Sequence, residues 1–344
     1  MGPALIENHN SQGIFNIDGL RTLAAAAPGR FLVDGLFKEK SVNILVGNST
    51  IGKTPLMVTF GIAVASGTEV FGLSTIQGSV LYADLESTPE EFITRLEQIS
   101  KMAGLAEVPK NFDVWSPHWD LTNVVTNYSD ALMKRVEARA YSLVIIDPLR
   151  NFFPDMEQHA DKAGAVWNTL RKLGQKLSTA FCFVHHLRKE QAEQGRLIDD
   201  PHRWFQNAAG SHALINGADL RLGAETEQRD TDELTLAGLR RGAGPIAPIH
   251  LVRDHDPDGE VLGYRRVIGL DRLTDEQRTA LNKLSPVFRF VDVQHVLTTK
   301  GASAVAGFLK ALVNHGIAVK LDGRQGYKKL MPIPGAAGAL ALAA

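Results

Sequence analysis

The chain has 344 residues, a length that predicts two domains at roughly 100–200 residues each. Its 37 basic and 38 acidic residues give a net charge of −1, which argues against a uniformly basic nucleic-acid-binding surface but not against a local one. The single cysteine, Cys182, excludes an intramolecular disulfide, and no apolar run approaches the roughly 20 residues of a transmembrane helix. We therefore expect a soluble, cytoplasmic protein without a secretory signal.

Apolar segments and helical patterns alternate between residues 41 and 186. We predict buried strands at 41–47, 79–85, 112–117, 141–147 and 179–186. Amphipathic patterns between them predict helices at 54–66, 89–102, 129–140 and 161–177. Strands that alternate with helices indicate βαβ units, so we predict an α/β fold with a mainly parallel twisted sheet and helices on both faces.

The pattern changes after residue 187. Residues 188–206 are polar, basic and weakly periodic, and we predict a long loop there. Shorter segments then predict antiparallel strands at 218–225, 232–242, 248–254 and 259–270. Together these segments define a core at 31–272, which follows an N-terminal arm or short helix at 1–30.

A smaller unit is predicted at 286–330, after a charged linker at 273–285. A helix, a turn, a second helix capped by Ser303 and a hairpin follow one another, which is the order found in winged-helix domains. Residues 287–330 carry seven Lys and Arg and two Asp and Glu, a net charge of +5, so the remainder carries −6. We expect this unit to contact duplex DNA; an oligomerisation appendage is the alternative. The tail at 331–344 is expected to be flexible.

A phosphate-binding loop follows the first predicted strand and matches G-x-x-x-x-G-K-[ST] at every fixed position. Its eight residues are Gly47, Asn48, Ser49, Thr50, Ile51, Gly52, Lys53 and Thr54. The glycines let successive backbone N–H groups face phosphates, and the following helix N-terminus adds partial positive charge. In this motif the lysine reaches the β- and γ-phosphates and the Thr54 hydroxyl binds Mg²⁺. We therefore predict a site for ATP and Mg²⁺.

Four segments in order resemble the RecA-like P-loop ATPases, and in particular the plasmid-type hexameric replicative helicases (RepA-like). They are LVGNSTIGKT, VLYADLESTPEEFITRL, LVIIDPL and VHHLRK. The resemblance covers about residues 31–250. It implies a RecA-like core that hydrolyses ATP with Mg²⁺ and assembles into a homo-oligomer, with a hexamer favoured.

The resemblance assigns roles to two acidic residues. Asp147 matches the Walker B aspartate that holds the Mg²⁺ shell, and the alternative is a surface acid that caps a strand. Glu86 resembles the general base that orients the attacking water. Asp84, on the same side of the strand, is its rival. The alternative for Glu86 is that it only caps the next helix.

The resemblance also assigns a γ-phosphate sensor to the strand that ends in two histidines. We favour His186, with His185 as the second choice. The alternative is that both histidines are structural groups at a sheet edge. A zinc site is not favoured, because adjacent histidines point to opposite sides of a strand and Cys182 is the only cysteine.

In hexameric relatives, a basic residue near the strand at 232–242 enters the neighbouring ATP site as an arginine finger. Arg240 and Arg241 are the candidates here. The family's Lys-x-Arg form is not intact, since Gly238 stands at its first position. A solvated basic face is the alternative.

The loop at 188–206 occupies the place where related ATPases grip single-stranded DNA. The candidate phosphate-binding residues are Arg188, Lys189, Arg196 and Arg203. Trp204 is a candidate for stacking on a base. The same loop carries four acidic residues, so a plain surface loop is the alternative.

Three functions are consistent with these features. The preferred hypothesis is a ring-forming replicative helicase of plasmid or phage type that acts on DNA. The second is a DNA-binding ATPase switch, a regulator or loader, without unwinding activity. The third is a small-molecule P-loop kinase, which predicts a phosphorylated product and no response to DNA. No membrane partner is expected.

Overall fold

The computed structural model describes residues 16–26, 29–120, 122, 125–188, 195–210, 212–226, 231–255, 259–267, 269, 273–297, 301–321 and 326–330. The chain forms two compact units, residues 1–30 and 31–344. The described part of the first unit contains helix α1 (Ile17–Ala26). Three parts of the sequence predictions lie outside the described residues. They are Lys189 of the candidate DNA loop, Arg324 at the tip of the predicted C-terminal hairpin, and the tail at 331–344.

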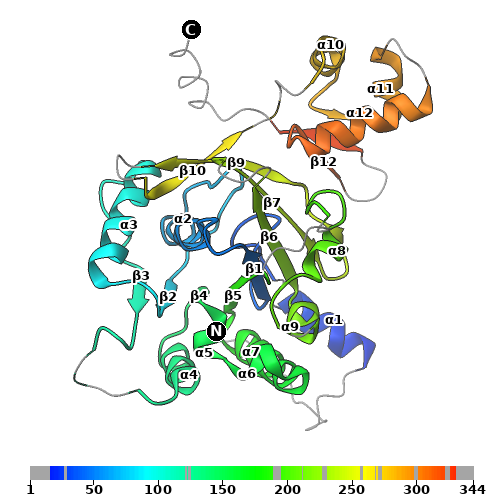
Figure 1. The fold of residues 1–344 in the computed structure, drawn as a ribbon. Coiled ribbons are helices and arrows are strands. Elements are labelled where there is room, and N and C mark those ends of the chain that lie inside the picture. The colour runs from blue at the N-terminus through cyan, green and yellow to red at the C-terminus, as the bar shows by residue number, and fades with distance from the viewer. Residues whose placement is uncertain are drawn as a thin grey trace, which may run out of the picture. The chain divides into compact units, whose positions relative to one another are not determined.

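The larger unit is built on one ten-stranded sheet (Figure 1). Six neighbouring strands pair in parallel. In spatial order they are β3 (Phe112–Trp115), β2 (Val80–Asp84), β4 (Leu143–Asp147), β5 (Ala180–His186), β1 (Val42–Gly47) and β6 (Leu220–Thr226). The mainly parallel α/β architecture predicted from the sequence, consistent with a RecA-like fold, is confirmed.

An antiparallel extension continues the sheet beyond β6. It consists of β7 (Glu233–Arg240), β9 (Ile249–His255), β10 (Val261–Val267) and the short β8 (Gly244–Pro245). The segment at 218–225 differs from the prediction, because β6 pairs in parallel with β1 and antiparallel only with β7. The reason is the connection after β5, which contains two short helices. It returns the chain to the end of the sheet where the parallel strands begin, so β6 starts beside the start of β1.

Helices cover both faces of the sheet (Figure 1). One face packs against α2 (Lys53–Ser66) and α3 (Pro89–Met102). The other packs against α4 (Tyr128–Ala138), α5 (Leu149–Phe152), α6 (Asp155–Gln158), α7 (Ala160–Leu177), α8 (Pro201–Phe205) and α9 (His212–Gly217). Strand alternation explains the two cores, since Leu45 faces the first while Ile44 and Val46 face the second. The long loop predicted at 188–206 thus contains α8, and α9 was not predicted.

The C-terminal part has its own core. Its elements are α10 (Asp275–Lys283), β11 (Val287–Phe288), α11 (Phe290–Val296), α12 (Ala302–Asn314), β12 (Ala318–Lys320) and β13 (Tyr327–Lys329). The strands form a sheet in the order β11-β13-β12. The segment predicted as a linker contains α10, which buries Ala280 and Leu281 in this core. The predicted cap at Ser303 is wrong: α12 begins one residue earlier, and its N-cap is Gly301, which has no side chain to donate or accept.

Within the part of the chain that the structure describes, no helix is both long enough and apolar enough to cross a membrane.

Candidate active site

The parallel strands bring the predicted site residues together at the end of the sheet where these strands finish, which we call the carboxyl edge. The phosphate-binding loop follows β1, Asp84 and Asp147 end β2 and β4, and His186 ends β5. The strand register aligns Asp84 with Asp147 and Gly47 with His186. Ligands of open α/β sheets bind outside the carboxyl ends of such strands, so this edge is the candidate active site.

The two fixed glycines of the loop are required by the local geometry. Gly52 is the N-cap of α2 and has a φ of 83°, a left-handed conformation that favours glycine. A Cβ at Gly52 would collide with the hydroxyl of Tyr264, and one at Gly47 would lie 3.0 Å from the backbone oxygen of Ala224. The loop is therefore compact, and it leads directly into the N-terminus of a 14-residue helix that suits an anion.

Lys53 lies buried at the start of α2, with 4% of its surface exposed. Its Nζ donates to the backbone oxygen of Asn48 at 2.7 Å and lies 3.3 Å from Nδ1 of His186. Burial lowers the pKa of Lys53 to about 8, while the charges of Asp147 and Glu86 favour its protonated form. A phosphate group next to Lys53 would favour that charged form further.

Asp147 is buried and accepts two hydrogen bonds at one oxygen. Thr54 Oγ1 and the Tyr82 hydroxyl each donate to its Oδ2 at 2.7 Å. Burial raises the pKa of Asp147, and both hydrogen bonds oppose that shift by stabilising the carboxylate. A hydroxyl and a carboxylate in contact are hard oxygen donors of the kind that Mg²⁺ uses together with phosphates and water. The residues therefore fit Mg²⁺, and the alternative of a surface acid does not fit this buried position.

Asp84 and Glu86, the rival candidates for the base, have different surroundings. Asp84 is fully buried, its Oδ2 accepts from the backbone N–H of Ser87 at 2.9 Å, and burial raises its pKa to about 6. Glu86 has 43% of its side chain exposed, and its Oε1 lies 3.6 Å from Nη2 of Arg150. Burial and then Asp147 raise the pKa of Glu86, while Arg150 and Lys53 oppose them. Water can reach Glu86 but not Asp84.

The alternative role of Glu86 as a helix cap is wrong. Thr88 caps α3: its hydroxyl accepts from the backbone N–H of Glu91 at 3.2 Å, and Glu91 Oε2 accepts from the backbone N–H of Thr88 at 2.8 Å. The two helical donors are thus satisfied by a capping box. Glu86 therefore does not cap α3.

The two histidines of β5 point to different surroundings. His186 lies beside Lys53, and burial, followed by the charges of Lys53 and Arg150, lowers its pKa to about 4, so it is neutral at pH 7. His185 is buried with Nε2 2.8 Å from the backbone oxygen of Ala209. Only His186 is therefore brought to the phosphate-binding loop. No group of three His, Cys, Asp or Glu suited to a metal ion occurs among the described residues.

The two candidate finger residues lie at the opposite end of the sheet, where the parallel strands begin. Arg240 ends β7 opposite Leu220, the first residue of β6, so it is remote from the phosphate-binding loop of its own chain. It donates to the backbone oxygen of Gly35, and its guanidinium lies 5.0 Å from the ring centre of Phe31. Arg241 donates to the backbone oxygen of Asn216 at 2.8 Å. A role for either would require a second subunit.

The candidate DNA loop is only partly as predicted. Arg188, Arg196 and Arg203 are exposed, as phosphate contacts would require. Trp204 contradicts its predicted stacking role, because it is 1% exposed and its Nε1 donates to Oε1 of Glu225 at 2.8 Å. An indole has a large apolar surface and one hydrogen-bond donor. Here the surface is buried in the core and the donor has its partner inside the protein.

Three further side chains contact the site from distant parts of the sequence. Tyr82 binds Asp147, as described above. The Tyr264 hydroxyl donates to the backbone oxygen of Gly52, and Arg253 Nη1 lies 3.4 Å from the backbone oxygen of Thr50. Strand periodicity could have suggested Tyr82, which is two residues before Asp84 and on the same side. Tyr264 and Arg253 carry no such signal, because only the sheet brings β9 and β10 to the loop.

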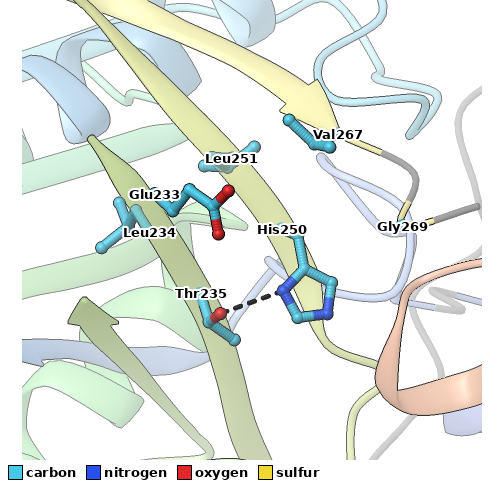
Figure 2. Close-up of a pocket in the computed structure, with 7 residues that line it drawn as sticks. All are labelled: Glu233, Leu234, Thr235, His250, Leu251, Val267 and Gly269. Atoms are coloured by element: carbon cyan, nitrogen blue, oxygen red, sulfur yellow. Dashed lines mark hydrogen bonds between the residues drawn. The ribbon is translucent and has the colours of Figure 1, made fainter. Parts of the chain in front are cut away.

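A separate recess lies between the antiparallel strands (Figure 2). His250 and Thr235 line it, joined by a hydrogen bond of 3.0 Å between Nδ1 and Oγ1. Its volume of about 10 Å³ is near the lower limit for a single water molecule. It is therefore too small for a nucleotide.

Comparison with known proteins agrees with this geometry. The model of the AAA_25 family, described as an AAA domain, matches residues 18–192, which is just over half of the chain. No curated protein matches the sequence. The matched region contains the phosphate-binding loop, Glu86, Asp147 and His186. The chain is therefore a member of this AAA domain family and has a P-loop ATPase domain.

Proposed function

We propose that the protein is a Mg²⁺-dependent motor ATPase that acts on DNA as a ring-forming replicative helicase of plasmid or phage type. The observation that carries the ATPase part is the hydrogen bond between Thr54 and the buried Asp147, beside the buried Lys53. These are the three groups that a P-loop site needs for a phosphate chain and its metal ion.

The site residues divide the work of hydrolysis. Lys53 and the backbone N–H groups of the loop bind the β- and γ-phosphates, and Thr54 and Asp147 hold the Mg²⁺. Mg²⁺ held there would supply positive charge that offsets the negative charge of the phosphates. Glu86 accepts the proton of the attacking water as the new bond to the γ-phosphorus forms. The bond to the β,γ-bridging oxygen breaks, and ADP and phosphate are released.

His186 links this chemistry to the candidate DNA loop. It contacts Lys53 through Nδ1, and Arg188 follows it by two residues. A neutral imidazole senses the γ-phosphate by hydrogen bonding rather than by charge. We propose that its movement is passed to Arg188, Arg196 and Arg203, which hold the phosphates of single-stranded DNA.

The C-terminal part supports a second DNA contact. Its elements follow the order helix, strand, helix, helix, strand, strand, which supports a winged-helix domain. The net charge of +5 between residues 287 and 330 favours a nucleic-acid partner. We propose that α12 and the following hairpin contact duplex DNA.

Assembly into a hexamer is proposed from the positions of the two arginines. Arg240 and Arg241 lie at the edge of the sheet opposite the phosphate-binding loop. A ring places this edge of one subunit next to the ATP site of another. The side chain of Arg241 is 51% exposed and is the better placed of the two to reach a neighbour.

ATPase rates with and without single-stranded DNA, together with the mass in solution, test the proposal. We expect DNA-stimulated hydrolysis by an oligomer, and at least a hundredfold loss of turnover in Lys53→Ala and Glu86→Gln. Lys172→Ala, an exposed lysine on α7, is the matched control. Wild-type turnover in both site variants, or a DNA-insensitive monomer, contradicts the proposal.

A forked-duplex assay separates the helicase from the second candidate, a DNA-binding ATPase switch. Hydrolysis that DNA stimulates without strand displacement favours the switch, in which the basic C-terminal part supplies DNA binding.

A further inference from the structure

Arg150 lies beside Glu86, and none of the motifs above includes it. Its Nη2 is 3.6 Å from Oε1 of Glu86. The contact follows from the fold: β2 and β4 are neighbours in register, so the residues that follow Asp84 and Asp147 emerge side by side. The pair therefore joins two different segments at the edge of the sheet where the nucleotide is expected.

The short helix α5 holds Arg150 in this position. Leu149 and Phe152, on either side of it in the sequence, are 0% and 2% exposed and belong to the core. These anchors leave the side chain of Arg150 outside, with 55% of its surface exposed. The guanidinium is thus presented on a fixed base rather than on a loop.

The charge of Arg150 acts on the whole site. Glu86 is faced by Asp147 from β4, by Lys53 from α2 and by Arg150 from α5. Burial and Asp147 raise the pKa of Glu86, whereas Arg150 and Lys53 favour its carboxylate. Arg150 also lowers the pKa of Lys53 and of His186. Its charge is therefore part of the electrostatic balance of the site.

A stabilising role is a poor explanation for the pair. Both side chains are close to half-exposed, and exposed ion pairs contribute at most about 1 kcal/mol to stability. A general base has a stronger requirement, because its oxygen must hold one orientation toward the water that it activates. A glutamate paired with an arginine meets that requirement better than one that rotates freely.

We propose that Arg150 is the positioning residue of Glu86, which it holds through one carboxylate oxygen so that the other is available to the attacking water. The proposal rests on the function proposed above, in which Glu86 activates water.

Turnover and nucleotide binding of Arg150→Gln test the proposal. We expect kcat to fall about tenfold, which corresponds to about 1.4 kcal/mol, while the Kd for ATP with Mg²⁺ changes less than twofold. Arg150→Lys keeps a charge near Glu86, and we expect it to recover part of the loss. The matched control is Arg139→Gln, because Arg139 is 54% exposed and pairs with Asp113 at 2.5 Å. We expect wild-type kcat from this control.

A double variant identifies the route of the effect. If Arg150 acts through Glu86, then Arg150→Gln adds no further loss to Glu86→Gln, as single-turnover release of phosphate can measure. An additional tenfold loss in the double variant overturns the proposal. The proposal is also overturned if folded Arg150→Gln and folded Arg150→Lys both keep a kcat within twofold of wild type. Absence of hydrolysis by the wild type is a different result, which overturns the proposed function instead.

Discussion

Asp84 and Asp147 show how the surroundings of single residues separate two identical side chains. They end neighbouring strands in register, and both are buried. Asp147 accepts from Thr54 and Tyr82, which favours the carboxylate needed for Mg²⁺. Asp84 accepts from Ser87 through Oδ2, while its Oδ1 meets no donor among the described residues. Burial raises the pKa of both carboxyl groups, and hydrogen bonds oppose the shift in each.

The pH dependence of stability tests the effect of burial on Asp84. Folding raises the pKa of Asp84 from 3.8 to about 6, so the folded state binds this proton more tightly. The contribution to stability is thus full at low pH and is lost as the pH rises through about 6. Asp84→Asn removes this dependence, and we expect it to raise the free energy of unfolding at pH 7 by about 1–3 kcal/mol.

Urea unfolding at pH 5 and pH 7, in EDTA, measures the effect. Asp199→Asn removes an exposed carboxyl group and is the control, with little change expected at either pH. A wild-type pH slope in Asp84→Asn contradicts the prediction.

At the scale of elements, the end of the antiparallel extension supports the phosphate-binding loop. The hydroxyl of Tyr264 on β10 donates to the backbone oxygen of Gly52, at the start of α2. The loop is thus enclosed by a strand that comes more than 200 residues later in the sequence. Its shape depends on the sheet as well as on its own glycines.

Gly52→Ala tests that dependence. The substitution carries the cost of a left-handed alanine, about 1–2 kcal/mol, and a collision with Tyr264. Gly242→Ala is the matched control, because its φ is 77° and no atom lies within 4 Å of an added Cβ. We expect both to lower the free energy of unfolding, and only Gly52→Ala to abolish nucleotide binding, as fluorescent ADP titration can measure. Equal nucleotide binding by the two variants contradicts the prediction.

The start of α3 provides a second prediction at this scale. Because Thr88 caps the helix, Thr88→Ala is expected to lower the free energy of unfolding by about 1 kcal/mol. Glu86→Gln is expected to leave stability unchanged and to lower turnover at least about a hundredfold. Thermal unfolding and ATPase assays on both variants check the pair of outcomes, and a loss of stability in Glu86→Gln would restore the capping role.

At the scale of the whole molecule, the proposed catalytic groups lie at opposite ends of the strands of one sheet. Lys53, Glu86 and Asp147 lie at one edge and Arg241 at the other. One chain cannot bring both sets to the same nucleotide. The proposed ring solves this by pairing the two edges of different subunits.

Mixing two inactive variants tests this arrangement. Lys53→Ala lacks a working nucleotide site but keeps Arg241, and Arg241→Ala keeps the nucleotide site. In mixed oligomers, some interfaces contain both intact groups, so we expect ATPase activity to recover to about a quarter of wild type when equal amounts are mixed. Mixing Lys53→Ala with Glu86→Gln is the control, since both defects lie in the same site. Activity no greater than the sum of the two variants contradicts a finger in the partner subunit.

The sequence by itself determined the parts of the protein whose interactions are local. The G-x-x-x-x-G-K-[ST] spacing identifies the phosphate-binding loop, and apolar runs and helical periodicity locate the central strands and the four longer helices between them. Asp147 and His186 were predicted from the resemblance to RecA-like ATPases, because each ends an apolar segment in the ordered set of motifs. Each of these features is recorded in a single short stretch of the sequence.

Only the tertiary structure decided which side chains meet across the sheet. It placed Trp204 in the core rather than on a surface for DNA. It brought Tyr82 into contact with Asp147 and Arg150 close to Glu86. It also placed Arg240 and Arg241 at the end of the sheet away from the phosphate-binding loop. The connection through α8 and α9 likewise decided that β6 runs parallel to β1. The physical reason is that strand order and direction follow from how whole elements pack, and no local pattern of residues records them.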